Sequence, residues 1–404
     1  MAILRRHERR RKARWKGKKK VPVSSIRHRF ADTGTRFGKF YQPAAASTLE
    51  EKLADAAEVH RLTGTCPSVA VHVLWDFRPD QDPKEVVRLA ESFGVRIGAI
   101  NPNVFQDQEY KLGSFCSPDP VARKKALDHT LYSIEIGRAV GSTLLSMWLA
   151  DGTNYPGQDN IVRRKHDLEA AFKTIHDAMP PGMKVLIEYK PFEPAFYHTD
   201  IADWGMSYVL AKHSGPNAKV LVDTGHHLPG TNVEHIVAFL LDEGMLGGFH
   251  FNDKKYADDD LELATIDPYA VFRIFNVIAQ HEFDTGRKPE IAYMVDQSHN
   301  LKPKIEAMIQ TVDMAQILYA KAQLVDRKAQ AVAQQACDIV AAERYLVDAF
   351  QTDVRPVVAE WRKSKGLPVD PLKAHRESGY VERVAKERTA AREARGEVQS
   401  SSFA

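Results

Sequence analysis

The chain has 404 residues, of which 44% are hydrophobic and 27% charged, an ordinary composition for a globular protein in water. It contains no run of about 18 or more apolar residues, which argues against a membrane span, and its first residues lack the apolar core of a secretory signal. The three cysteines, Cys66, Cys116 and Cys337, match no metal-binding spacing, so we expect reduced thiols in a cytoplasmic protein.

Positive charge is concentrated at the N-terminus. Residues 1–20 contain eleven Lys and Arg and one acid, Glu8, although the formal net charge of the whole chain is only +3. A basic arm of this kind can bind nucleic acid. The rest of the chain is acidic, however, and shows no basic groove that would extend such a contact. We therefore expect residues 1–31 to be a disordered basic segment, and nucleic-acid binding is not favoured.

From about residue 48 onward, short apolar runs alternate with helical patterns. The apolar runs are bounded by Gly, Pro or Asn and lack strict alternation, which is typical of strands buried on both faces. They predict strands at 69–75, 96–100, 143–147, 184–189, 218–223, 246–251 and 291–296. The intervening patterns predict helices near 48–62, 83–93, 120–140, 161–178, 200–213, 233–243 and 267–281.

This order predicts a (β/α)8 barrel, also called a TIM barrel, over residues 32–320. Strands that alternate with helices are parallel, and an eighth strand near 21–26, the one with the weakest pattern, would close the ring. From about residue 302 the pattern is helical, and 302–351 is typical of one long helix. We expect a C-terminal helical extension and charged tail over 321–404. The last 30 residues could form either subunit contacts or a solvated tail, and the sequence does not decide between these alternatives.

The last four strands of the predicted barrel each end at ionisable residues. They end in IEYK, VDTGHH, FHFND and VDQSH, and active-site groups of such barrels come from these C-terminal strand ends. Three carboxylates that meet at one rim need a cation nearby, and oxygen-rich sets with one nitrogen suit Mn²⁺, Mg²⁺ or Co²⁺. Any one of these residues alone would be better explained as a cap or salt bridge. Together they predict a metal site made of Glu188, Asp223, His250 and Asp296.

A second ion is predicted beside the first. His226 follows Asp223 by three residues, and Asp258 and Asp260 are separated by one residue, so both can point the same way. Asp223 would then bridge the two ions, while Asp259 would face away. An acidic, solvated loop is the alternative explanation of Asp258 and Asp260.

Other residues at the predicted strand ends fit a sugar pocket. Aromatic faces pack against the C–H surfaces of sugars, while His, Asn and Lys can bind hydroxyls. The residues concerned are His72, Trp75, Asn101, Trp148 and Lys190. Motifs for nucleotide hydrolysis, dinucleotide redox chemistry and serine esterase chemistry do not occur in the chain.

Five stretches also match a known enzyme family. They are GSTLLSMWLADGTNYPGQ, IEYKPFEP, LVDTGHHLPGTN, GGFHFNDKKYADDDL and MVDQSHN, in order over roughly residues 32–320. They resemble the L-rhamnose isomerases of the catabolic type with relaxed sugar specificity. The resemblance implies a cytoplasmic homotetramer that interconverts L-rhamnose and L-rhamnulose. It also implies two divalent ions per subunit, Mn²⁺ or else Mg²⁺, Co²⁺ or Zn²⁺.

The resemblance also implies roles for single residues. It assigns the substrate-binding ion to the first set of four and the catalytic ion to His226, Asp258 and Asp260, with Asp223 shared. It implies that the catalytic residues are His226, Asp258, Asp260 and Asp296. Substrate contacts would come from His72, Trp148 and Lys190, and from Phe37 of a neighbouring subunit. Upstream of about residue 32 the resemblance ends.

Three other function classes are consistent with parts of the pattern. A single-metal ketose 3-epimerase of the same barrel superfamily typically flanks its substrate with two glutamates, whereas the last strand here ends in Asp296. A metal-dependent nuclease usually takes a third ion and more His ligands. A non-catalytic barrel would make the ionisable rim a coincidence.

Overall fold

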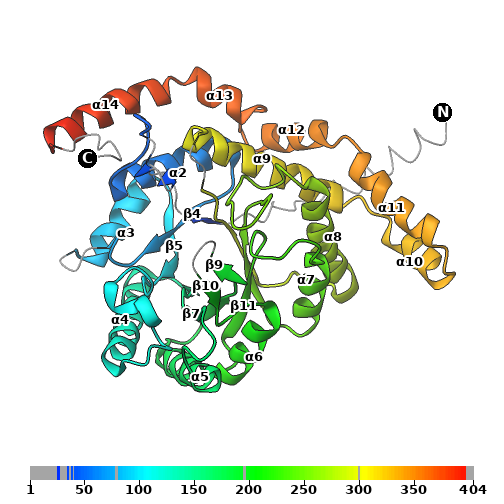
Figure 1. The fold of residues 1–404 in the computed structure, drawn as a ribbon. Helices are drawn as coiled ribbons and strands as arrows, with labels where there is room; N and C mark the ends of the chain where they lie inside the picture. Colours follow the sequence, from blue (N-terminus) through cyan, green and yellow to red (C-terminus); the bar gives the residue numbers. More distant parts are fainter. Residues whose placement is uncertain are drawn as a thin grey trace, which may run out of the picture.

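The computed structural model describes residues 25–27, 34–35, 38–39, 41–77, 81–193, 197–298 and 301–396. Eight parallel strands close into a barrel with helices around it, so the predicted (β/α)8 barrel is confirmed (Figure 1). In the order in which they pair, the strands are β1 (Ser25–Arg27), β13 (Ala292–Val295), β12 (Leu246–Phe251), β11 (Ala218–Asp223), β8 (Lys184–Glu188), β6 (Leu144–Met147), β5 (Arg96–Asn101) and β4 (Ser68–His72).

The predicted strands agree with these bounds to within a few residues. The strand predicted at 69–75 ends earlier, at His72, because Leu74 adopts a left-handed backbone conformation with a φ of 83°. The eighth strand, predicted near 21–26, lies at Ser25–Arg27 and pairs with both β13 and β4. It therefore precedes residue 32, where the barrel was expected to begin.

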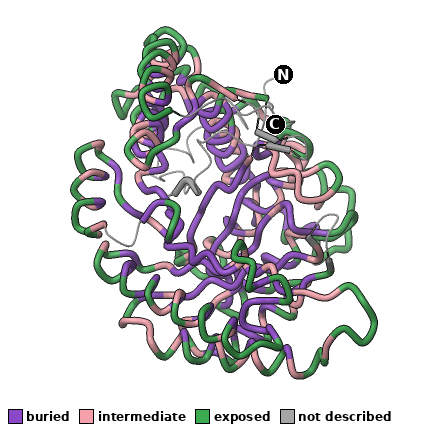
Figure 2. The backbone as a smooth tube through the Cα atoms, turned by 60° about the vertical axis from the view of Figure 1, so that its left-hand side comes forward, coloured by how far each residue is buried: buried purple, intermediate pink, exposed green. Residues whose placement is uncertain are grey.

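Helices cover the outside of the barrel, and polar caps fix their first turns. Thr48 forms a capping box with Glu51, and Asn160 accepts a hydrogen bond from the backbone N–H of Arg163. These helices are α2 (Leu49–Thr63), α3 (Pro83–Ser92), α4 (Pro120–Val140), α5 (Ile161–Ala178), α6 (Trp204–Ser214), α7 (Val233–Asp242), α8 (Pro268–Thr285) and α9 (Lys304–Ala322). Figure 2 shows the buried strands at the centre, and helices that alternate between buried and exposed residues around them.

The side chains that fill the barrel determine which residues reach its C-terminal rim. Its filling consists of small and medium apolar side chains: Ala70, Ala99, Leu186, Leu221, Ala292 and Met294. Side chains of a strand alternate between its faces, so the residue two positions later again points inward, now at the C-terminal rim. The buried residues at these later positions are His72, Asn101, Glu188, Asp223 and Asp296.

On β12 a glycine takes the interior position. A Cβ at Gly248 would lie 2.8 Å from the carbonyl oxygen of Ala292 on the neighbouring strand, so only glycine fits this close approach. His250 follows two residues later and joins the polar residues at the rim.

The C-terminal extension differs from the single long helix predicted over 302–351. The chain there forms three helices, because Asp326 and Asp338 each cap a new helix and Cys337 has a left-handed φ of 56°. The helices that follow α9 are α10 (Arg327–Gln335), α11 (Ile339–Gln351), α12 (Arg355–Ser364), α13 (Pro371–Glu377) and α14 (Tyr380–Ala394). No strand follows residue 302 in the described part of the chain, as predicted.

Helix α14 returns to the start of the barrel, which excludes a solvated tail for residues up to 394. Arg388 donates to both carboxylate oxygens of Asp55 on α2, at 2.7 and 2.9 Å, and Arg392 donates to backbone carbonyls of residues 42, 43 and 45. Both arginines are buried despite their charge. Their long side chains therefore hold the extension against the first helix of the barrel.

Short elements lie outside the barrel. They are a sheet of β7 (Gly152–Thr153), β10 (Tyr197–Thr199) and β9 (Phe192–Glu193), a hairpin of β2 (Gly34–Thr35) and β3 (Gly38–Lys39), and the 3₁₀ helix η1 (Gln108–Leu112). Phe37, the basic run 1–20 and residues 397–404 lie outside the described residues. Among the described helices, none is both long and apolar enough to cross a membrane.

Candidate metal centre

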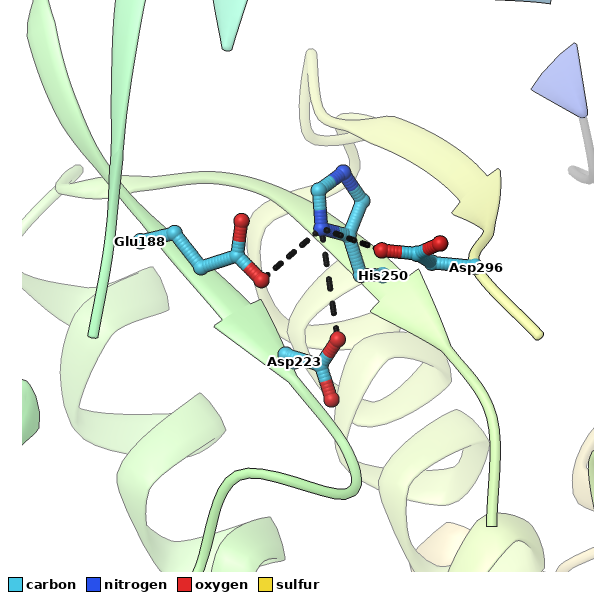
Figure 3. A group of neighbouring side chains, drawn as sticks. All are labelled: Glu188, Asp223, His250 and Asp296. Atoms are coloured by element: carbon cyan, nitrogen blue, oxygen red, sulfur yellow. Dashed lines mark ion pairs between the residues drawn. The ribbon is translucent and has the colours of Figure 1, made fainter. Parts of the chain in front are cut away.

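Four side chains from four neighbouring strands converge at the C-terminal rim (Figure 3). The Nδ1 atom of His250 lies 3.1 Å from Glu188 Oε1 and 3.6 Å from Asp296 Oδ2. Asp223 Oδ2 lies 4.0 Å from the same nitrogen. All four residues are buried, and one ligand atom from each lies within 4.8 Å of the others.

This arrangement fits a divalent cation. Three carboxylates this close together repel one another, and burial removes the water that would screen them. Burial raises the pKa of Asp223 to about 6, and the neighbouring Glu188 adds to the rise, while the imidazole of His226 opposes it. Three carboxylates and one imidazole are the donor set that suits Mn²⁺, Mg²⁺, Co²⁺ or Zn²⁺. Glu188, Asp223, His250 and Asp296 would hold the ion.

A second acid–imidazole pair lies beside the first group. His226 Nε2 is 3.1 Å from Asp258 Oδ1 and 3.9 Å from Asp223 Oδ2. Burial alone would lower the pKa of His226, but the charge of Asp223 and the hydrogen bond to Asp258 raise it to about 10. Burial likewise opposes ionisation of Asp258, yet His226 and Lys190 hold its pKa well below the usual range. Both shifts favour a charged His226–Asp258 pair in the metal-free protein.

Aromatic side chains form one wall of the site. The rings of His72 and Trp75 lie 4.3 Å apart, and those of Phe105 and Trp148 lie 4.9 Å apart. Lys190 Nζ lies 5.2 Å from the centre of the Trp148 ring and 2.6 Å from Asp258 Oδ2. This lysine therefore connects the aromatic wall to the second acid–imidazole pair.

Comparison with known proteins places the chain in a family. Residues 65–293 match the family described as xylose isomerase-like TIM barrel. A probable sugar isomerase of Rhizobium meliloti (strain 1021) is 40% identical over 362 residues, which covers 88% of this chain and 84% of the relative. The chain belongs to the xylose isomerase-like TIM barrel family. A probable sugar isomerase of Mesorhizobium japonicum matches this xylose isomerase-like protein equally well, at 40% identity over the same shares of both chains.

More distant similarities are found as well. The xylose isomerase of Thermus thermophilus is 24% identical over 234 residues, which covers 52% of this chain and 57% of that enzyme. A D-allulose 3-epimerase from Methylomonas sp. superimposes with a TM-score of 0.53 at 16% identity, over 72% of this chain and 95% of that one. An L-ribulose 3-epimerase gives a TM-score of 0.51 at 13% identity, over 81% and 97%. At these identities the superpositions show the fold alone.

In this xylose isomerase-like barrel, the two predicted ion sites differ in compactness. His226, Asp258 and Asp260 do not form, within the described part of the chain, a group with Asp223 as close as the first set. Asp260 has a left-handed φ of 48°, and its carbonyl oxygen accepts a hydrogen bond from Ser298. The second ion site stays a prediction.

Two neighbouring aspartates in the loop after β12 allow the role of Asp258 to be tested against a control. Asp258 faces His226 and Lys190, whereas the neighbouring Asp259 accepts hydrogen bonds from the backbone N–H groups of Lys255 and Tyr256. We expect Asp258→Asn to lower kcat for the sugar by about 100-fold, because the pair with His226 loses its charge. Asp259→Asn keeps an oxygen that can accept and should change kcat less than about twofold. Equal effects of the two substitutions in steady-state assays would contradict the role of Asp258.

A further acidic group does not need an ion. One ligand atom each from Cys116, Asp151 and Asp200 lies within 4.8 Å of the others. The guanidinium of Arg164, 1% exposed, forms ion pairs with Asp200 at 2.7 Å and with Asp159 at 2.9 Å, so a cation is already present. Asp151 accepts hydrogen bonds from backbone N–H groups and the Ser114 hydroxyl. This group holds loops together.

Arg164 connects three loops at the rim. It donates to the carbonyl oxygens of Leu112 and Cys116 in the loop after β5, and to that of Gly152 in the loop after β6. Its partner Asp200 belongs to the loop after β8.

Sequence reasoning missed two residues of the site. Phe105 belongs to the aromatic wall, and the only available signal was its place shortly after a predicted strand. Asn252 donates hydrogen bonds to Asp223 from a buried position. Its signal was available, because it stands two residues after His250 and therefore faces the same way. The next residue, Asp253, accepts hydrogen bonds from the backbone N–H groups of residues 266 and 267.

Proposed function

We propose that this protein is a divalent-metal-dependent aldose–ketose isomerase, with L-rhamnose and L-rhamnulose as its preferred pair and Mn²⁺ as its ion. The observation that carries this proposal is the convergence of three buried carboxylates and one imidazole at the open end of the barrel. The relatives named as probable sugar isomerases support the reaction class. The five stretches that resemble L-rhamnose isomerases support the choice of sugar, the ion and a homotetramer.

The reaction moves two hydrogens within the sugar. The hydrogen on C2 passes to C1, and the O2 hydroxyl proton is lost while O1 gains one, so that an aldehyde becomes an alcohol. A divalent ion, when bound, polarises the sugar oxygens and orients C1 and C2. His226 and Asp258 would hold the second ion, with the imidazole neutral. Asp258 Oδ2, 2.6 Å from Lys190 Nζ, would take the proton released from O2 and return it to O1.

Other residues bind the sugar and exclude water. Lys190 Nζ lies against both Asp258 and the Trp148 ring, where it can donate to a sugar hydroxyl. The rings of Phe105, Trp75 and Trp148 offer apolar surface to the C–H groups of the sugar. L-Rhamnose carries a methyl group at one end, which suits such a wall.

A sugar panel with metal-stripped and reloaded protein tests the proposal. We expect no conversion of L-rhamnose after chelation, and recovery when Mn²⁺ is restored, with product measured by chromatography. Conversion of D-allulose or L-ribulose to the C3 epimer, with no aldose formed, would instead identify a ketose 3-epimerase. Equal activity with and without metal would overturn the proposal. Deuterium from solvent at C1 of the product would count against a pure hydride shift.

A further inference from the structure

Asn252 makes three polar contacts beneath the metal centre. Its Nδ2 atom lies 3.0 Å from Asp223 Oδ1, 3.1 Å from Asp223 Oδ2 and 3.0 Å from the carbonyl oxygen of Asp296. All three partners are acceptors, so the NH₂ group of the amide, and not its oxygen, must face them. The residue is 1% exposed, and water does not compete for these contacts.

These contacts decide which way Asp223 points. Oδ1 of this carboxylate also accepts from the backbone N–H of Gly225 at 2.7 Å. Oδ1 therefore accepts from two donors and Oδ2 from Asn252 alone. Oδ2 lies near both imidazoles, 3.9 Å from His226 Nε2 and 4.0 Å from His250 Nδ1. This is the position from which one carboxylate can serve both predicted ions.

Neighbouring residues fix Asn252 itself. Its backbone N–H donates to the hydroxyl of Thr224 at 3.0 Å, and that hydroxyl donates to the carbonyl of Asn252 at 2.7 Å in one rotor setting. A Cβ at position 225 would lie only 2.5 Å from Asn252 Oδ1. Gly225 is therefore required by the amide beside it, because its own φ does not lie in the left-handed region.

We propose that Asn252 is a positioning residue that, together with Gly225, orients Asp223 so that it is shared between the two ion sites. It acts through Asp223 and the backbone of Asp296, and it touches neither ion nor sugar. This inference rests on the proposed function, since it assumes that the centre binds divalent ions.

The test is a calorimetric titration in which Mn²⁺ alone, without sugar, is added to the metal-free protein. Loss of a group that orients a metal ligand costs about 10–100-fold in affinity. We expect Asn252→Ala to weaken Mn²⁺ binding by this factor and to lower the number of ions bound at a given concentration. Gly225→Ala, which leaves every hydrogen-bonding group in place but displaces the amide, should weaken binding in the same direction.

The control is Gln316→Ala. Gln316 is another buried amide, but its partners are Thr63 and Arg362, far along the chain from the centre. It reports what a general loss of stability does to metal binding, and we expect its Mn²⁺ affinity to match that of the wild type. Thermal unfolding of the metal-free variants identifies any that fail to fold.

The outcomes separate this inference from the proposed function. If the wild-type protein binds no divalent ion, the proposed function fails. If the wild type binds Mn²⁺ while both Asn252→Ala and Gly225→Ala bind it equally well, the positioning role alone is overturned. An equal loss in Gln316→Ala would also overturn it, because the effect would then follow from stability.

Discussion

His250→Ala and Asp296→Asn are each expected to lower isomerase activity by at least ~1,000-fold. Loss of a group that merely orients a ligand already costs 10–100-fold, and these substitutions remove ligands themselves. His250 has the central position, with its Nδ1 atom facing Glu188, Asp223 and Asp296. Its removal leaves three buried carboxylates without the imidazole. Metal content by elemental analysis and steady-state kinetics measure the two effects.

A surface histidine provides the control for this result. His213 on α6 pairs with Glu169 and is exposed, so His213→Ala should keep full metal content and activity. Full metal content together with full activity in either variant of the centre would rule out the assignment of these residues as ligands.

Arg388→Met is expected to lower the free energy of unfolding by about 3–5 kcal/mol at pH 8, because it leaves a buried carboxylate without its partner. Asp55 is buried on α2, and Arg388 and Tyr380 donate to it from the C-terminal extension. Urea denaturation monitored by circular dichroism measures the loss. Arg383→Met is the matched control on the same helix, since the ion pair of Arg383 with Glu387 is exposed, and it should cost less than about 1 kcal/mol.

The loss in Arg388→Met should depend on pH. Burial raises the pKa of Asp55 to about 6, above the ordinary value of 3.8, although Arg388 opposes the rise. A raised carboxyl pKa means that stability falls as the pH rises from the ordinary value through the folded one. Without Arg388 the pKa rises further, so the variant continues to lose stability above pH 6 after the wild type has levelled off. The difference between the two should therefore be smaller at pH 5 than at pH 8, and a difference independent of pH would show that Asp55 is not involved.

Much of the barrel and of the first ion site followed from local patterns. A strand buried on both faces is recognisable because its residues are apolar without alternation, and Ala218–Asp223 and Leu246–Phe251 have the bounds predicted from this pattern. Glu188, Asp223, His250 and Asp296 came together because each follows an inward-facing position by two residues on a parallel strand. That regularity requires no knowledge of distant contacts.

The features that could not be predicted depend on contacts between distant segments. Arg388 meets Asp55 across 333 positions of the chain, and the charged sequence of α14 resembles that of a solvated helix. The breaks at Asp326 and Asp338 carried a local signal, because aspartate favours the N-cap, but the surrounding Ala and Gln favour continued helix. The contact of Lys190 with the Trp148 ring joins the loops after β8 and β6, and the spacing of residues in the sequence does not predict it.

The buried guanidinium of Arg164 has a mechanical consequence for how sugars enter. Because it joins the loops after β5, β6 and β8, a movement of any of these loops breaks at least one hydrogen bond to this buried group. Leaving a buried group without its partner costs about 1–3 kcal/mol. These three loops should therefore form a rigid part of the barrel entrance. Adjustment to sugars of different shape then falls to loops outside this network, such as the segment 253–266, which carries Asp258.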